Sequence, residues 1–140
     1  MGMIVADECG LGKTLTAIEA ARKTRDMSVI WRCLVVCPPA LIPQWQDELT
    51  AQDPHMPVTV VNRLPVDVRQ VQGYMLMGIY DLSSSAVRQA FQEILLDVII
   101  LDEAHRIKNR KTKTAQWIKK MPVIAAVSCF PPSSPFELAM

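Results

Sequence analysis

Residues 7–14 read Asp-Glu-Cys-Gly-Leu-Gly-Lys-Thr, and this stretch organises the interpretation of the whole chain. A short apolar run, Met3–Ala6, precedes it, and a helical pattern over Lys13–Lys23 follows it. A strand, a glycine-rich turn and a helix in this order place backbone N–H groups and a helix N-terminus around a phosphate group. The sequence therefore predicts a phosphate-binding loop between a first strand and a first helix.

Each residue type in this loop has a chemical reason to be there. Gly10 and Gly12 leave room for backbone N–H groups to converge on a phosphate. Lys13 would reach the β- and γ-phosphates of a nucleotide, and the Thr14 hydroxyl would ligate Mg²⁺. The general pattern has Gly where this chain has Asp7. A chance Gly-x-Gly-Lys-Thr turn therefore stays open as an alternative on the loop alone.

A second motif, residues 102–105, reads Asp-Glu-Ala-His and directly follows the strongly apolar run Val98–Leu101. An acid at the carboxyl end of a buried parallel strand lies where open α/β sheets place their ligands. Asp102 would hold Mg²⁺, directly or through water, and Glu103 would orient and deprotonate an attacking water. A lone Asp-Glu pair at a strand end is usually structural. Downstream of a Gly-Lys-Thr loop, it predicts a site for a nucleotide and Mg²⁺, with Lys13 and Glu103 as the candidate catalytic residues.

The rest of the chain alternates short apolar runs with helical patterns. The apolar runs are Met3–Ala6, Cys33–Cys37, Val58–Val61, Met75–Ile79, Val98–Leu101 and Val123–Val127, and the expected helices are Lys13–Lys23, Leu41–Leu49, a segment from Ser83 to about Leu95, and Thr112–Lys119. Because these strands are apolar throughout and alternate with helices, we expect an α/β fold with parallel strands and helices on both faces of one sheet.

Composition is that of an ordinary globular domain. Of the 140 residues, 50% are hydrophobic and 21% are charged, with a net charge of +1, so overall charge argues neither for nor against nucleic acid. The charge is unevenly distributed, because residues 106–120 hold seven Lys or Arg and no Asp or Glu. Such a block is usually a solvated helix face, and beside a nucleotide site it is also a candidate phosphate-contacting patch.

The cysteines and the lengths of the apolar runs indicate the cellular compartment of the protein. Cys9, Cys33, Cys37 and Cys129 lack the Cys-x-x-Cys spacing of a zinc site. No apolar run approaches the length of a membrane span, and no secretory leader precedes the loop. We expect an intracellular protein with reduced cysteines and no membrane partner, cytoplasmic and nucleoid-associated in a prokaryote or virus and nuclear in a eukaryote.

The motifs in combination resemble one family. Ala6–Thr14 is similar to the phosphate loop of the Swi/Snf-type helicase-like DNA-dependent ATPases of helicase superfamily two, in which Asp stands at the position of Asp7. Asp102–Asn109 resembles the family's second motif, including the Lys-Asn at its end. Leu34–Leu49, with its strand, proline turn and Trp-containing helix, resembles the motif that lies between them. The resemblance runs from about Gly2 to Val127.

The resemblance implies a three-layer RecA-like P-loop domain with a central, mostly parallel sheet, incomplete in this chain. Such a lobe binds ATP and Mg²⁺ as the first half of a two-lobed motor that moves along double-stranded DNA. The turn Pro38–Ile42 would touch the DNA backbone, and His105, next to the nucleotide, would link the site to the neighbouring lobe. By residue type alone, His105 is more often a hydrogen-bonded core residue. Trp45 is expected in the core, because it shares an apolar face with Leu41 and Leu49.

The chain departs from the family at three places. No adenine-gripping helix precedes the loop, and no second lobe with arginine fingers follows Met140. Where the family's coupling motif reads Ser/Thr-Gly-Thr-Pro, this chain has a degenerate version over residues 128–131, Ser-Cys-Phe-Pro, in which Phe130 supplies no hydroxyl. Because an arginine finger is worth roughly 10³–10⁵ in rate, we expect residues 1–140, a partial helicase ATP-binding lobe, to bind ATP with little turnover.

Two other functions stay open on the sequence. A non-catalytic remnant would bind DNA or a partner protein through residues 106–120, and an unrelated P-loop NTPase would share only the loop. Nucleotide binding that is lost on Lys13→Ala favours the ATPase lobe. DNA binding that is indifferent to ATP and to that substitution favours the remnant.

Overall fold

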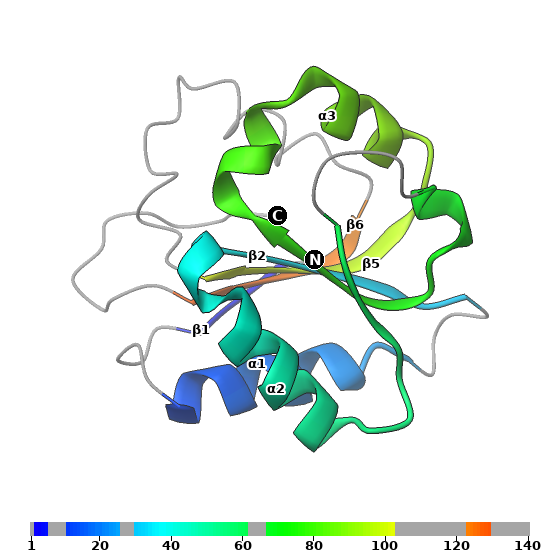
Figure 1. Ribbon diagram of the computed structural model, residues 1–140. Helices are drawn as coiled ribbons and strands as arrows, with labels where there is room; N and C mark the ends of the chain where they lie inside the picture. The colour runs from blue at the N-terminus through cyan, green and yellow to red at the C-terminus, as the bar shows by residue number, and fades with distance from the viewer. Residues whose placement is uncertain (1, 6–10, 26–29, 62–66, 103–122, 130–140) are drawn as a thin grey trace.

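The described strands form one six-stranded sheet through the centre of the molecule (Figure 1). The computed structural model describes residues 2–5, 11–25, 30–61, 67–102 and 123–129. The strands are β1 (Gly2–Val5), β2 (Arg32–Cys37), β3 (Val58–Val60), β4 (Gly73–Gly78), β5 (Leu96–Asp102) and β6 (Val123–Cys129). Their order is β1-β6-β5-β2-β4-β3, and every neighbouring pair is parallel. The expected α/β fold with a parallel sheet is confirmed.

In the described part of the chain, three α-helices cover the sheet. These are α1 (Leu11–Arg22), α2 (Ile42–Gln52) and α3 (Ser85–Gln92). Figure 1 shows α1 and α2 on one face and α3 on the other, which gives the three layers expected of this fold class. No described helix is long and apolar enough to span a membrane.

The alternation of side chains along the strands explains the two-sided core. In β2, Leu34 and Val36 join the apolar cluster under α3, whereas Cys33, Val35 and Cys37 join the cluster under α1 and α2. Strands β4 and β5 divide in the same way, for example at Ile99 and Ile100. Each of these side chains is almost completely buried, and burial of one such aliphatic side chain contributes roughly 1.5–3 kcal/mol. Strands apolar on both faces are therefore the reason that helices cover both faces.

The element boundaries differ from the expected ones by a few residues. Helix α3 ends at Gln92 rather than near Leu95, because the chain must turn before β5 begins at Leu96. It begins at Ser85, two residues after the expected start, and the Ser84 hydroxyl accepts a hydrogen bond from the N–H of Val87 at 3.4 Å. Strand β4 begins at Gly73, whose φ of 86° is accessible to glycine. The expected helix Thr112–Lys119 lies outside the described residues.

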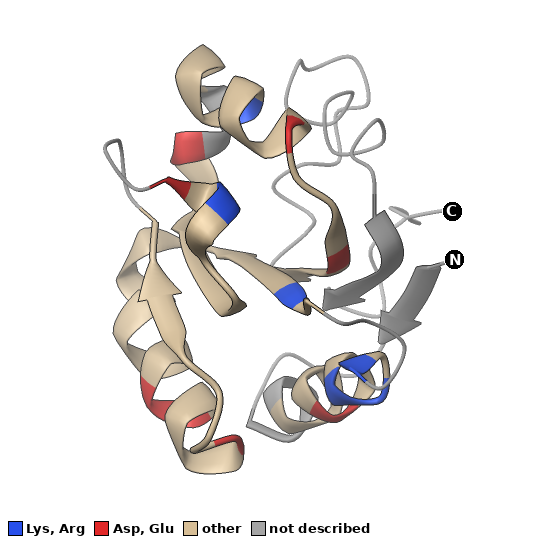
Figure 2. Ribbon diagram, turned by 90° about the vertical axis from the view of Figure 1, so that its right-hand side faces the viewer, with Lys and Arg blue, Asp and Glu red and all other residues tan. Residues whose placement is uncertain are grey.

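Charged residues lie on the helices, in the connecting turns and near the ends of the described strands (Figure 2). In β2 the only charge is Arg32, the first residue, and β4 has none. In β5 the acids are Asp97, one residue from the start, and Asp102, the last residue. The two edges of the sheet, where strands begin and where they end, are therefore the places where polar chemistry can occur.

Candidate nucleotide-binding site

The two sequence motifs arise from the same edge of the sheet. Strand β1 ends at Val5, directly before the predicted phosphate loop, and β5 ends at Asp102, the first residue of the acidic motif. Strand β6 lies between them, and its Cys129 is in register with Val5 on one side and with Asp102 on the other. Two inter-strand spacings amount to about 10 Å, so the strand that leads into the loop and the acid end close to each other at this edge.

The first turn of α1 carries the Gly-Lys-Thr triplet. The helix begins at Leu11, two residues earlier than the sequence predicts, so Gly12, Lys13 and Thr14 lie at its N-terminal end. Parallel strands and the helix that follows them run in opposite directions, and α1 packs against β1, β5 and β6. Its N-terminus, which carries a partial positive charge and unpaired N–H groups, is therefore at the carboxyl edge of the sheet, as phosphate binding requires.

Several predicted site residues lie outside the part of the chain that the structure describes. These are Asp7 and Gly10 in the loop, Glu103 and His105 in the acidic motif, and the side chains of Lys13 and Thr14. The basic stretch 106–120 also lies outside it, as do Phe130 and Pro131 of the altered coupling segment. Ser128 and Cys129 are described through their backbone and end β6, so this segment emerges between the two motifs.

Asp102 is the described centre of the candidate site. It is partly exposed at the end of β5, and its Oδ2 accepts a hydrogen bond of 2.8 Å from the indole Nε1 of Trp45 on α2. The expectation that Trp45 is a core residue is confirmed by its 3% exposure. The contact to Asp102 was missed by sequence reasoning, because the two residues are 57 positions apart and no local pattern joins them.

Cys37 lies beside this carboxylate at the end of β2. Register pairs Val36 with Leu101, which brings Cys37 and Asp102 next to each other. Burial, together with the negative charge of Asp102, raises the pKa of the Cys37 thiol to about 12. Cys37 is therefore a neutral, apolar wall of the site and not a nucleophile. Cys33 and Cys37 are both free and buried, in agreement with the expectation for these two cysteines.

The proline turn after β2 completes the described part of this edge. Pro39–Leu41 form the short 3₁₀ turn η2, which leads directly into α2. The end of β4 approaches the same turn so closely that a Cβ on Gly78 would lie 3.1 Å from Cγ of Pro39. Tyr80, in the 3₁₀ segment η4 (Ile79–Ser83), is 68% exposed. The edge thus presents η2 and η4 beside the acidic motif.

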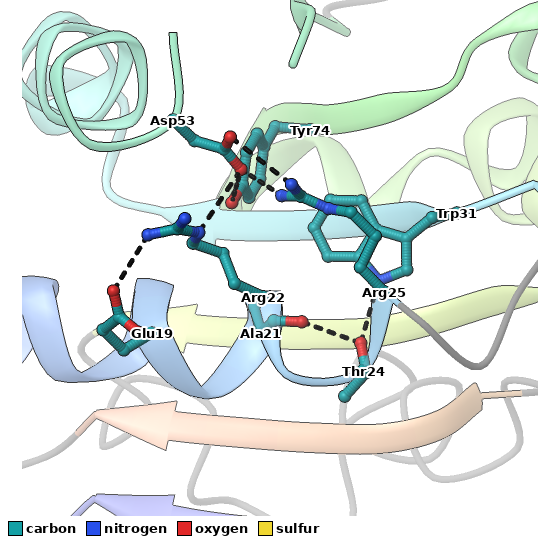
Figure 3. Close-up of polar contacts among 8 residues, drawn as sticks. All are labelled: Glu19, Ala21, Arg22, Thr24, Arg25, Trp31, Asp53 and Tyr74. Carbon is teal, nitrogen blue, oxygen red and sulfur yellow. Dashed lines mark hydrogen bonds and ion pairs between the residues drawn. The ribbon is translucent and has the colours of Figure 1, made fainter. Parts of the chain in front are cut away.

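A second polar cluster, which sequence reasoning did not predict, lies at the opposite edge (Figure 3). The buried carboxylate of Asp53, at the end of α2, is paired with the Arg25 guanidinium and accepts a 2.9 Å hydrogen bond from the Tyr74 hydroxyl. Arg25 also lies over the Trp31 ring, 4.9 Å from its centroid. Burial lowers the pKa of Arg25, but the hydrogen bond and charge of Asp53 outweigh this effect and the pKa is raised.

This cluster is structural. It joins the ends of α1 and α2 to the first residues of β2 and β4, and the Trp31 indole adds a 2.8 Å hydrogen bond to the Thr24 hydroxyl. Burial, with the Cys33 thiol and Asp53 nearby, raises the pKa of Tyr74, so its hydroxyl remains a donor. Among the described residues, no group of three or more His, Cys, Asp or Glu is arranged to hold a metal ion.

The fold is that of an open α/β protein with a parallel sheet, and comparison with known proteins identifies the family. The SNF2-related domain matches residues 1–125, so the chain belongs to the SNF2-related family. It is 32% identical over 132 residues to "DNA excision repair protein ERCC-6-like" of Bos taurus, covering 86% of this chain and 11% of that protein. It is 30% identical over 118 residues to "Uncharacterized ATP-dependent helicase YqhH" of Bacillus subtilis (strain 168), covering 84% of this chain and 21% of that protein.

A solved structure agrees with this assignment. The chain described as "Sulfolobus solfataricus SWI2/SNF2 ATPase core in complex with dsDNA" superposes with a TM-score of 0.75 and 25% sequence identity, over 94% of this chain and 28% of that chain. The Swi/Snf resemblance and the RecA-like fold predicted from the motifs are confirmed. This chain spans between 11% and 28% of the length of these relatives.

Proposed function

We propose that this chain is the ATP-binding first lobe of a Swi/Snf-type DNA-dependent ATPase. The observation that carries the proposal is the register across β1, β6 and β5, which places Val5 and Asp102 at one edge of the sheet on either side of Cys129. This register brings the start of the phosphate loop and the acidic motif together, and membership of the SNF2-related family supports the same reading.

The proposed site divides its work between the two motifs. Backbone N–H groups of Gly10 and Gly12, with the N-terminus of α1, would hold the phosphates, and Lys13 would pair with the β- and γ-phosphates. Asp7 would take the place that Gly has in other phosphate loops. Glu103 would accept a proton from the attacking water.

The residues present fit a magnesium ion. Mg²⁺ prefers oxygen ligands supplied by one or two protein groups together with phosphate, and the oriented Asp102 carboxylate at the strand end is such a group. Thr14, in the first turn of α1, would supply a hydroxyl. When bound, the ion would neutralise charge on the phosphates. His105 would lie next to the nucleotide and face the neighbouring lobe.

Double-stranded DNA is the proposed polymer partner, and a second RecA-like lobe is the proposed protein partner. The turn η2 and the exposed Tyr80 of η4 lie at the same edge as the site, where a DNA backbone could lie close to both. An arginine finger from a second lobe is worth roughly 10³–10⁵ in rate. In the absence of such a lobe, residues 1–140 would therefore bind ATP and turn it over slowly. The proposed location is the nucleus of a eukaryote or the cytoplasm of a prokaryote.

Titration of the chain with ATP in the presence of Mg²⁺, followed by calorimetry, tests the proposal. Lys13→Ala should weaken ATP binding by about tenfold to a hundredfold, the value of a hydrogen bond to a charged group. Lys23→Ala is the matched control, because Lys23 is exposed and lies one residue beyond α1, about 15 Å from Lys13 along the helix axis. Equal affinity of the Lys13→Ala variant and the wild type would refute the proposed site.

A further inference from the structure

Trp45 holds the candidate metal ligand from the side of the core. It lies in the first turn of α2, and its ring belongs to the apolar cluster beneath α1 and α2. The indole N–H of this buried side chain points to the edge of the sheet and reaches Oδ2 of Asp102 at 2.8 Å. A ring fixed on all sides by packing therefore presents one donor to one oxygen of the carboxylate.

The partner of this indole is chemically specific. An indole N–H can only donate, so it favours the ionised carboxylate oxygen as acceptor and gives that oxygen a fixed direction. A buried indole N–H needs some acceptor, but it does not need an acid. Trp31, which is equally buried in the same cluster, donates over the same 2.8 Å to the Thr24 hydroxyl. The Trp31 indole therefore donates to a neutral hydroxyl, whereas the Trp45 indole donates to the carboxylate of Asp102.

We infer that Trp45 is a positioning residue that orients the Asp102 carboxylate toward the magnesium ion of the ATP complex. The inference rests on the proposed function, because it gives Asp102 the role of metal ligand. Groups that hydrogen-bond a metal-ligating side chain fix its orientation and strengthen the metal site, and their loss typically costs 10- to 100-fold in metal affinity or activity. Trp45 is therefore part of the site as well as part of the core.

The test compares two substitutions that remove the same kind of hydrogen bond. Trp45→Phe and Trp31→Phe each delete an indole N–H and keep an aromatic ring in the same apolar cluster. For each variant, ATP affinity is measured by calorimetry with Mg²⁺ and again with a chelator. The affinity with Mg²⁺ divided by the affinity with the chelator gives the contribution of the metal. We expect this ratio to fall about tenfold in Trp45→Phe and to stay at the wild-type value in Trp31→Phe.

A second measurement needs no variant at Trp45. The chain has three Trp residues, and the indole N–H signals in a proton–nitrogen NMR spectrum can be assigned with Trp31→Phe and Trp117→Phe. Addition of Mg²⁺ to the ATP complex should shift the Trp45 indole signal, because the metal withdraws charge from its acceptor. The Trp31 signal should stay in place.

The outcomes separate this inference from the proposed function. Wild-type chain that fails to bind ATP overturns both. Wild-type chain that binds ATP through Lys13 and Mg²⁺, with an unchanged metal ratio in Trp45→Phe or an unmoved Trp45 indole signal, overturns this inference alone. A Trp45 role limited to packing would change the free energy of unfolding and leave the metal ratio unchanged.

Discussion

Two carboxylates, Asp102 and Asp53, lie at opposite edges of the same sheet, and aromatic donors hold both of them. At the strand-beginning edge, Asp53 is 4% exposed, paired with Arg25 and bonded to the Tyr74 hydroxyl. At the strand-ending edge, Asp102 is partly exposed, and the neutral indole of Trp45 donates to it. An indole orients a carboxylate without cancelling its negative charge.

The difference teaches how one residue type acquires two roles. The charge of Asp53 is balanced by a guanidinium inside the fold, so its contribution is to stability. Asp102 lies at the carboxyl edge, beside β6 and two strands from the start of the phosphate loop, where open α/β sheets bind ligands. Its contribution is expected in ligand binding.

The largest effect is expected at Asp53. Asp53→Ala leaves Arg25 without its described counter-charge and Tyr74 without its acceptor, and loss of one partner of a buried ion pair costs 3–5 kcal/mol. Because Arg25 is partly exposed, we expect a loss of about 3 kcal/mol in the free energy of unfolding, measured by urea denaturation. Asp67→Ala is the control, since that acid is exposed and paired with Arg69. If Asp53→Ala lowered the free energy of unfolding no more than the control does, the cluster would not have the structural role assigned to it.

An intermediate effect, of the opposite kind, is expected at Asp102. Asp102→Asn keeps an oxygen that can accept from Trp45 but removes the negative charge. The contribution of Mg²⁺ to ATP affinity should fall roughly tenfold, which corresponds to about 1.4 kcal/mol. The free energy of unfolding should change by less than about 1 kcal/mol, because the hydrogen bond is retained. Calorimetry measures the Mg²⁺-dependent ATP affinity, and urea denaturation of the same preparation measures the free energy of unfolding. A large loss of stability with an unchanged Mg²⁺ dependence would show that Asp102 has the structural role and not the ligand-binding role.

The smallest effect is expected from the Cys37 thiol beside Asp102. Its pKa is about 12 in the fold, against 9.0 for an ordinary cysteine, so the unfolded chain loses this proton first as pH rises. Stability contributed by the neutral thiol is complete below pH 9 and declines as pH rises toward 12. Between pH 7 and pH 10, the free energy of unfolding of the wild type should fall by about 1 kcal/mol more than that of Cys37→Ala. Urea denaturation of both proteins at the two pH values measures this difference. Parallel pH profiles of the two proteins would contradict this expectation.

Much of the fold was predictable because its signals are local. The apolar runs around Leu34 and Ile99 identified buried strands, and the alternation of strands with helices implied a parallel sheet. Helix ends were less certain, as at α3, because the last turn depends on where the next strand docks. The motif residues Lys13 and Asp102 were found from residue type and spacing, and the roles assigned to them remain proposals.

The contacts between distant segments were not predictable. Trp45 was expected in the core from its helical face, but periodicity carries no information on the direction of an indole N–H. The pair of Arg25 and Asp53 joins the ends of two helices 28 positions apart, and neither residue belongs to a recognisable motif. Such contacts depend on how the helices pack on the sheet.

The sequence by itself determined the α/β class, because strand and helix patterns are local, and its two motifs were specific enough in combination to show a resemblance to the Swi/Snf family. Only the tertiary structure decided that β6 lies between β1 and β5, that Trp45 holds Asp102, and that Asp53 is neutralised at the far edge. The physical reason is that strand order and side-chain pairing are set by packing among segments far apart in the chain.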